Sequence, residues 1–267
     1  MQLENATLLE HRDQGAGYRL LRLAAPQIAP QVQPGQFVHL RVPRLEAAVL
    51  RRPFSIYKAE NGELSLLYKA VGRGTGVLAS VTAGEAVSLI GPLGHGFPLD
   101  LPAGRVPVLV AGGYGMAALY LVARRLAMPG LVFVGGRSAP DILCVEEFEA
   151  LGWKVYVATE DGSRGVRGLV TGPLDAWLAE GRTGRTPEFF VCGPNGLLEV
   201  VGQRAMQNDW RAWLSVDRHM GCGVGACLTC VVKLKDADGT WLWARSCKEG
   251  PVFESRQINW DRAEEEA

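Results

Sequence analysis

Apolar and polar positions follow one pattern before about residue 105 and another after it. In the first part, short runs rich in Val, Leu, Ile, Phe and Tyr are separated by Pro-Gly, Asn-Gly and Ala-Gly turns at 34–35, 61–62 and 83–84. These runs predict strands at 18–25, 36–43, 53–59, 63–71 and 85–91. Short strands joined by tight turns are typical of an antiparallel β-barrel, so we expect one here.

After residue 105, buried runs alternate with stretches of helical periodicity. Strands are expected at 106–110, 131–134, 155–158 and 189–191, and helices at 116–127, 145–151, 173–180 and 196–207. This alternation predicts a parallel α/β sheet. A further strand near 212–216 leads into the C-terminal segment. We therefore divide the chain of 267 residues into a barrel over 1–103, an α/β domain over 104–212 and a small module over 213–267.

The C-terminal module contains four of the six cysteines in a spacing that predicts a metal cluster. The cysteines follow the pattern C-x4-C-x2-C…C of a plant-type [2Fe-2S] site, with Cys222, Cys227, Cys230 and Cys247 as ligands. Glycines at 221, 223 and 225 let the backbone approach the cluster and direct N–H groups at its sulfurs. A structural zinc site or a pair of disulfides is the alternative, although zinc ligands usually form two close cysteine pairs. The spacing therefore indicates electron transfer.

The remaining composition restricts the compartment and the partners. Cys144 and Cys192 are isolated from the motif and from each other, so the cysteines do not form a secreted disulfide framework and a cytoplasmic location is favoured. Basic and acidic residues number 28 each, and nothing in the charge pattern indicates nucleic acid or an anionic membrane as a partner. No apolar run approaches the ~18 residues of a membrane span, so we expect a soluble protein.

Two short motifs in the barrel predict a phosphate site. Residues 51–55 read Arg-Arg-Pro-Phe-Ser beside an expected strand, and residues 72–76 read Gly-Arg-Gly-Thr-Gly at an expected helix start, with Thr75 as its N-cap. Arg52 would supply charged donors, and the free N–H groups of the helix start would favour the same anion. An exposed edge arginine and an ordinary turn are the alternative interpretation of each motif taken alone.

The α/β domain opens with a glycine turn between a strand and a helix, where dinucleotide phosphates bind in such sheets. This turn contains Gly112, Gly113 and Gly115, although tight packing alone could also require them. The loops at 159–163 and 192–195, the latter containing Cys192 and Gly193, would converge on the same crevice. We therefore expect a nicotinamide site there, with Cys192 as a small buried residue rather than a reactive thiol.

Taken in order along nearly the whole chain, these motifs resemble the ferredoxin-reductase superfamily. The four-cysteine module, with Gly-Pro-Leu-Gly-His-Gly-Phe at 91–97, Glu-Asp-Gly-Ser at 160–163 and Cys-Lys-Glu-Gly-Pro-Val-Phe at 247–253, is similar to electron-transfer subunits of class B dihydroorotate dehydrogenase. The resemblance implies FAD in the barrel, NAD(H) as substrate of the α/β domain, and a separate FMN-containing catalytic subunit of pyrimidine biosynthesis in a heterotetramer of two copies each. It places around FAD Arg52, Pro53, Phe54, Ser55, Tyr68, Lys69, Gly74 and Thr75.

The implied chemistry is an electron relay, so we assign no general base or nucleophile. The histidines at 11, 39, 95 and 219 are scattered, and we interpret them as surface or structural residues. His219, beside the cluster loop, is the one that could instead support Cys222 through a contact behind the ligand. Tyr114 replaces a residue that is often Ile in relatives, and Arg137 follows the second α/β strand, where an arginine can pair with the 2′-phosphate of NADP. The preference between NAD and NADP therefore stays open.

Three alternative functions remain at this point. The first is a homologous subunit of an NADH-dependent ferredoxin:NADP oxidoreductase or of a sulfide dehydrogenase; the resemblance implies that the ferredoxin-linked relative tends to replace one cysteine by Asp, and Asp217 lies outside the ligand spacing. The second is a self-sufficient flavin reductase. The third is a non-enzymatic, metal-stabilised binding module, which a visible absorption spectrum would distinguish because a zinc module has no flavin or iron–sulfur bands.

Overall fold

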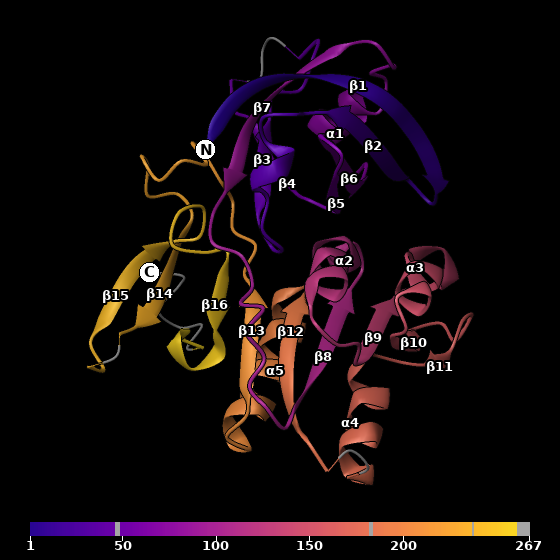
Figure 1. The fold of residues 1–267 in the computed structure, drawn as a ribbon, viewed down its shortest axis with the longest axis vertical. Helices are drawn as coiled ribbons and strands as arrows, with labels where there is room; N and C mark the ends of the chain where they lie inside the picture. The colour runs from indigo at the N-terminus through magenta and orange to yellow at the C-terminus, as the bar shows by residue number, and fades with distance from the viewer. Residues whose placement is uncertain (46–48, 182–183, 237, 261–267) are drawn as a thin grey trace.

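The computed structural model describes residues 1–45, 49–181, 184–236 and 238–260. In these residues the strands form two seven-stranded sheets and one separate hairpin. Figure 1 shows the first sheet at the top, the second below it, and the C-terminal segment beside both. The expected combination of an antiparallel β domain, a parallel α/β domain and a small C-terminal module is confirmed.

The first sheet is antiparallel throughout and curves into a half-barrel. Its strand order is β4-β3-β7-β1-β2-β6-β5. The short helix α1 (Arg73–Leu78) follows β6. The strands are β1 (Gln2–Gly15), β2 (Tyr18–Ala24), β3 (Phe37–Leu40), β4 (Arg52–Ser55), β5 (Lys58–Glu60), β6 (Glu63–Lys69) and β7 (Ala86–Leu93).

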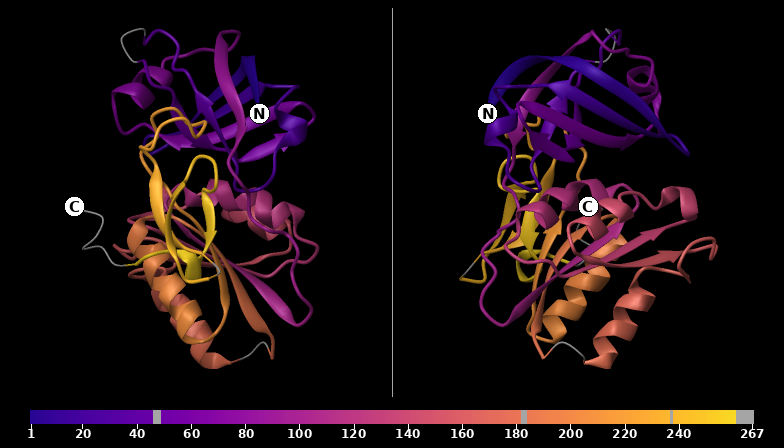
Figure 2. Two further views of the ribbon diagram at one scale, coloured as in Figure 1. Left: turned by 90° about the vertical axis from the view of Figure 1, so that its left-hand side faces the viewer. Right: turned by 45° about the vertical axis from the view of Figure 1, so that its right-hand side comes forward.

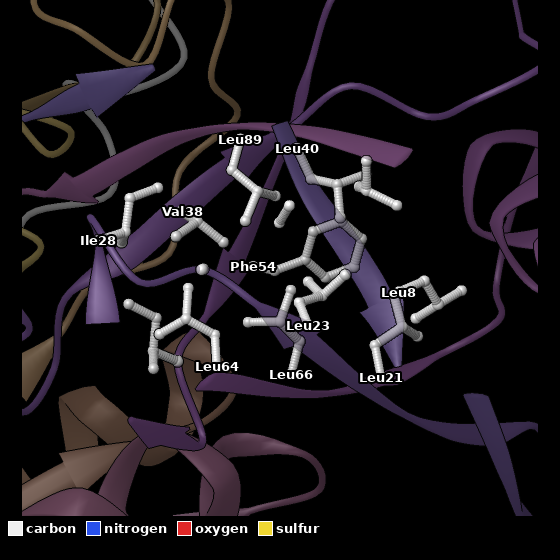
Figure 3. Packing of buried hydrophobic residues seen from close by; sticks show 14 of the residues in the cluster. Leu8, Leu21, Leu23, Ile28, Val38, Leu40, Phe54, Leu64, Leu66 and Leu89 are labelled. Carbon is white, nitrogen blue, oxygen red and sulfur yellow. The ribbon is translucent and has the colours of Figure 1, made fainter. Parts of the chain in front are cut away.

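Buried leucines from neighbouring strands fill this half-barrel. Alternate residues of β2 and β6 point inward, so that Leu21, Leu23, Leu64 and Leu66 meet around Phe54 of β4, as Figure 3 shows. Fully burying such a side chain stabilises a fold by about 1.5–3 kcal/mol. The packing of Phe54 therefore fixes β4 and, with it, the flanking residues that the sequence analysis assigns to a cofactor.

The second sheet has the strand order β11-β10-β9-β8-β12-β13-β16 and is parallel except for β16, which runs antiparallel to β13. Its strands are β8 (Arg105–Gly112), β9 (Leu131–Gly136), β10 (Lys154–Thr159), β11 (Val166–Arg167), β12 (Thr186–Cys192), β13 (Arg211–Ser215) and β16 (Val252–Glu254). Helices α2 (Gly115–Arg125) and α3 (Val145–Ala150) pack on one face, against Leu109 and Ala111. Helices α4 (Thr171–Glu180) and α5 (Asn195–Gln207) pack on the other, against Val108 and Val110.

The four helices expected after residue 105 are confirmed to within a few residues, as are the strands expected there. The strand expected at 53–59 is interrupted, because Ile56 and Tyr57 lie between β4 and β5. The sequence did not predict the longest strand, β1. Its fully buried apolar residues are Ala6 and Leu8, and two such residues do not form an apolar run that marks a strand. No described helix combines the length and the apolar character needed to span a membrane.

The C-terminal segment connects to both larger sheets. It contributes β16 to the second sheet, and its hairpin of β14 (Val231–Lys235) and β15 (Trp241–Arg245) packs into the same core as α5. Cys230 and Cys247 instead pack against Phe37 and Leu93 of the half-barrel. Figure 2 shows the segment lying along the junction of the two domains. The division at residues 103 and 212 stays a prediction, and β13 runs through the second of these boundaries.

Candidate functional site

A cleft of about 530 Å³ opens between the half-barrel and the carboxyl ends of β8, β12 and β13. It brings together most of the residues that the sequence analysis assigned to FAD and to the nicotinamide. These residues are Pro53, Phe54, Ser55, Tyr68, Lys69, Thr75, Gly112, Gly113, Gly115, Cys192 and Gly193. Segments far apart in the chain thus form one site.

Arg52 and Gly74 are in contact beside this cleft. A Cβ atom on Gly74 would lie 3.2 Å from Nε of Arg52, so the guanidinium lies across the first turn of α1. Arg52 also donates from Nη1 to the carbonyl oxygen of Leu50, at 2.7 Å. The arginine and the helix start therefore occupy the neighbouring positions that a shared phosphate would require.

The expectation that Thr75 caps α1 is wrong in its detail. Gly72, which has extended backbone, is the N-cap residue, and Thr75 lies in the first turn. The Thr75 hydroxyl reaches back and accepts hydrogen bonds from the backbone N–H groups of Val71 (3.0 Å) and Gly72 (3.1 Å). Its oxygen thus fixes the loop that leads into α1, which places Gly74 against Arg52.

Tyr68 forms a buried wall of the cleft. Its ring meets Phe54 edge to face, with centroids 5.5 Å apart, and its hydroxyl lies 3.2 Å from Nε2 of His11. Burial raises the pKa of Tyr68 to about 12, so the phenol is neutral at physiological pH. Tyr68 can therefore present an aromatic surface and a neutral hydroxyl to a ligand, but no charge.

Lys69 joins the half-barrel to the α/β domain. Its Nζ lies 2.8 Å from Oδ1 of Asp141 and 4.5 Å from the ring centroid of Tyr18, whose hydroxyl donates to the same carboxylate at 2.9 Å. Burial acts to raise the pKa of Asp141, but the hydrogen bonds from Lys69 and Tyr18 outweigh it and lower that pKa. Asp141 therefore fixes the position of Lys69 between the two domains.

A second cleft of about 620 Å³ continues from the first along the carboxyl ends of β8, β9 and β10. Both clefts are lined by Lys69, Gly112, Gly113 and Tyr114, and Tyr114 is 54% exposed between them. The second cleft also contains Arg137. An elongated ligand can therefore extend from one cleft into the other past Tyr114.

The glycine turn packs directly on the loop after β12. A Cβ atom on Gly115 would lie 2.7 Å from the carbonyl carbon of Cys192 and 3.2 Å from the backbone nitrogen of Gly193, and one on Gly112 would lie 2.7 Å from Cδ of Pro194. Both Gly112 and Gly115 are therefore needed for this approach. Cys192 is partly open to the cleft but is otherwise surrounded by protein atoms. This burial raises the pKa of its thiol to about 12, so Cys192 is not a reactive thiolate.

The four motif cysteines approach one another as two pairs. Sγ of Cys222 and Sγ of Cys227 are 3.4 Å apart, and the backbone N–H of Cys247 lies 3.5 Å from Sγ of Cys230. All six cysteines are free thiols, so no disulfide competes for them. Within the described part of the chain, no three His, Cys, Asp or Glu side chains form one group that could hold a single metal ion. Two thiolate pairs are what two tetrahedral irons require.

Hydrogen bonds point at the sulfurs of the first pair. The backbone N–H groups of Ala226 (3.2 Å) and Cys227 (3.3 Å) are directed at Sγ of Cys222, and the hydroxyl of Thr229 donates to Sγ of Cys227 at 3.3 Å. The Thr229 hydrogen bonds lower the pKa of Cys227 to about 6, with a further contribution from Cys222. Cys227 is therefore a thiolate at neutral pH, the form that binds metal.

Two side chains connect the first cleft to the second cysteine pair. Phe37 and Met220 both line the cleft and also pack against Cys230 and Cys247. This contact could not be predicted from the sequence, because nothing in the local pattern relates β3 to a loop almost two hundred positions later. Fixed contact through Phe37 and Met220 provides a short protein-filled path between the cleft and the cysteines.

The half-barrel, the two joined clefts and the paired cysteines define a flavin- and nicotinamide-linked oxidoreductase of the ferredoxin-reductase type. A family model described as the iron-sulfur cluster binding domain of dihydroorotate dehydrogenase B matches residues 217–259. The dihydroorotate dehydrogenase B (NAD(+)) electron transfer subunit of Desulforamulus reducens is 39% identical, covering 89% of this chain and 90% of its own. The Bacillus cereus subunit is 36% identical, covering 95% and 97%. The chain belongs to this family of dihydroorotate dehydrogenase B electron transfer subunits.

Solved structures support the same fold. An NADH-dependent reduced ferredoxin-NADP oxidoreductase, described in the context of flavin-based electron bifurcation, is 25% identical, with a TM-score of 0.83 over 98% of this chain and 92% of that one. A ferredoxin NADP+ reductase from Neisseria gonorrhoeae with bound FAD and NADP is 15% identical, with a TM-score of 0.64 over 78% of this chain and 92% of that one. The second similarity concerns the fold alone.

Proposed function

We propose that this chain carries electrons between a nicotinamide nucleotide and the FMN of a separate dihydroorotate dehydrogenase catalytic subunit, by way of FAD and a [2Fe-2S] cluster. The observation that carries this proposal is the continuity of the site: the second cleft opens into the first, and Phe37 and Met220 extend from the first cleft to the cysteines. Membership of the family supports the identity of the partner.

The residues divide among three ligands in this proposal. A flavin bound in the first cleft would supply the exchange between hydride transfer and single-electron transfer. For FAD we propose Arg52, Pro53, Phe54, Ser55, Tyr68, Lys69, Gly74 and Thr75; for the nicotinamide nucleotide Gly112, Gly113, Gly115, Cys192 and Gly193; and for the cluster Cys222, Cys227, Cys230 and Cys247.

The side chains of the first cleft position the ligands and shield them from water. Tyr68 and Phe54 supply a rigid aromatic wall, and the ion pair with Asp141 holds the Lys69 side chain in place. Cys192 stays a neutral thiol. Neither Tyr68 nor Cys192 ionises near neutral pH, because burial raises the pKa of each, and this supports a relay in which these two side chains do not act as bases.

Arg52→Ala is expected to weaken FAD binding by about 2 kcal/mol, roughly thirtyfold, because a charge-assisted hydrogen bond to a phosphate is lost. Fluorescence titration of the flavin-free protein measures this change. Arg41→Ala is the charge-matched control, since Arg41 is an exposed arginine of the half-barrel outside both clefts. Equal FAD affinity in the Arg52 variant and the control would contradict the assignment.

The family membership supports a heterotetramer of two copies of each subunit, NAD(H) as the substrate, and a cytoplasmic location, which the cysteine usage also favours. Arg137 lies in the second cleft, where it could meet the adenosine half of either nucleotide. We propose NAD(H) rather than NADP(H) because the relatives are named as NAD(+) enzymes.

Reconstitution with a dihydroorotate dehydrogenase catalytic subunit tests the proposed function. The isolated chain is expected to reduce artificial dyes with NADH but not to oxidise dihydroorotate, and the mixture is expected to reduce NAD⁺ with dihydroorotate. Dihydroorotate oxidation by the isolated chain would show that the proposal is wrong. The proposal would also be wrong if the chain did not associate with the catalytic subunit and instead reduced a ferredoxin. That result would favour the ferredoxin-linked alternative.

A further inference from the structure

His39 is a fully buried polar side chain with an unusual environment. It lies in β3, its residue is 0% exposed, and neither ring nitrogen has a hydrogen-bond partner within the described part of the protein. Leaving a buried donor or acceptor unpaired costs about 1–3 kcal/mol, so native proteins contain few such groups. We therefore expect a further hydrogen-bond partner for the His39 ring.

The cluster loop covers this ring. A Cβ atom on Gly223 would lie 2.8 Å from both Cγ and Cε1 of His39 and even closer to Nδ1, so only glycine allows the loop to approach so closely. The Cys222 backbone lies beside the ring. An imidazole carries at least one N–H donor in either protonation state.

The neighbours of His39 belong to the proposed electron path. Phe37, two residues earlier in β3, packs against Cys230 and Cys247 and lines the first cleft. On the other side, β3 pairs with β4, where His39 lies opposite Pro53. The imidazole thus lies in the strand between the proposed flavin site and the loop that contains Cys222. Arg51 and Arg52 act on the ring from the β4 side, and the loop that covers it on the other side is the one that contains Cys222.

We propose that His39 is a positioning residue of the half-barrel that donates its ring N–H to a sulfur of the cluster site on the Cys222 side. This inference rests on the proposed function only in requiring that the four cysteines bind a [2Fe-2S] cluster. Hydrogen bonds to cluster sulfurs stabilise the more negative, reduced form and so raise the reduction potential. His39 thereby adjusts the driving force between flavin and cluster without touching either nucleotide.

Variants that remove or keep the donor test this role. His39→Leu and His39→Met remove the N–H, whereas His39→Gln keeps a donor on a side chain of similar reach. The exposed His219, which precedes the cluster loop, supplies the control His219→Gln. For the donor-free variants we expect the oxidised form to be favoured about tenfold, which is 59 mV for a one-electron couple. His39→Gln is expected to recover most of that shift.

The measurements are a redox titration of the cluster in the whole chain, the electron paramagnetic resonance spectrum of its reduced form, and the iron and flavin content. Unchanged flavin content and an unchanged midpoint of thermal unfolding show that each variant is folded. If His39→Leu does not fold, His39→Met provides the donor-free measurement. Equal potentials and spectra in wild type and donor-free variants would overturn the inference, as would equal shifts for glutamine and methionine. Failure of the wild-type chain to bind iron would overturn the proposed function as well, so the two failures are distinguishable.

Discussion

Replacing Cys227 with serine is expected to remove the iron–sulfur cluster and leave the flavin bound. Cys227 has the lowered pKa of a metal-binding thiolate: the Thr229 hydroxyl donates a hydrogen bond to its Sγ, which lies 3.4 Å from Sγ of Cys222. A serine hydroxyl is not ionised at neutral pH and is a poor ligand for iron. The flavin residues lie in the half-barrel, whose core does not contain Cys227.

Iron analysis, the visible spectrum and two activities measure this effect. In the mixture with the catalytic subunit, dihydroorotate oxidation linked to NAD⁺ is expected to fall to the background without this chain, while the reduction of dyes by NADH persists. Cys144→Ser is the matched control, because Cys144 is buried at the start of α3 and distant in sequence from the cluster loop. A variant that retains two irons per chain, or that loses iron and flavin together, would contradict the prediction.

Gly115→Ala is expected to close the nicotinamide site. The added methyl group would lie within 2.7 Å of the Cys192 carbonyl carbon and would push the start of α2 away from the loop after β12. Overpacking of this kind costs on the order of 2 kcal/mol, so NADH affinity is expected to fall about thirtyfold while FAD binding is preserved. Equilibrium titration with NADH, together with the KM for NADH in dye reduction, measures the change.

Gly172→Ala controls for the substitution itself. Gly172 lies in α4, where an added Cβ atom would meet no atom within 4 Å, so the change is expected to be neutral or slightly stabilising. If Gly115→Ala binds NADH as tightly as this control does, the contact between the glycine turn and the Cys192 loop does not form the nicotinamide site.

The local patterns of the chain allowed much of the fold to be predicted. The α/β domain could be predicted because each buried strand, such as β9 or β12, is a continuous apolar run, and the helices between the strands show a clear helical period of apolar residues. By contrast, β1 alternates buried residues with polar ones and includes the buried Glu4, which accepts hydrogen bonds from the backbone of Gln27 and Ile28. Such a strand is defined by its neighbours, so the sequence alone did not indicate it.

The candidate site was predictable in its parts and not in its connections. The motifs around Arg52, Gly112 and Cys222 are local, and the order of the motifs along the chain related them to one family. The role of Phe37 and the burial of His39 depend on contact between β3 and a loop beyond residue 220. His39 was interpreted only as surface or structural, because a single histidine in an apolar strand has no sequence feature that distinguishes a buried donor from a core residue.

The addition of β16 to the α/β sheet, together with the packing of Cys230 and Cys247 against Phe37 and Leu93, gives the C-terminal module a mechanical role. The module holds the two domains together, because a hinge rotation that separated the half-barrel from the α/β domain would break the hydrogen bonds between β13 and β16 or separate Phe37 from the cysteines. We therefore expect the nicotinamide nucleotide to exchange through small local motions, such as rotation of the exposed Tyr114 side chain. The contacts between the cleft and the cysteines would then persist while the nucleotide binds and leaves.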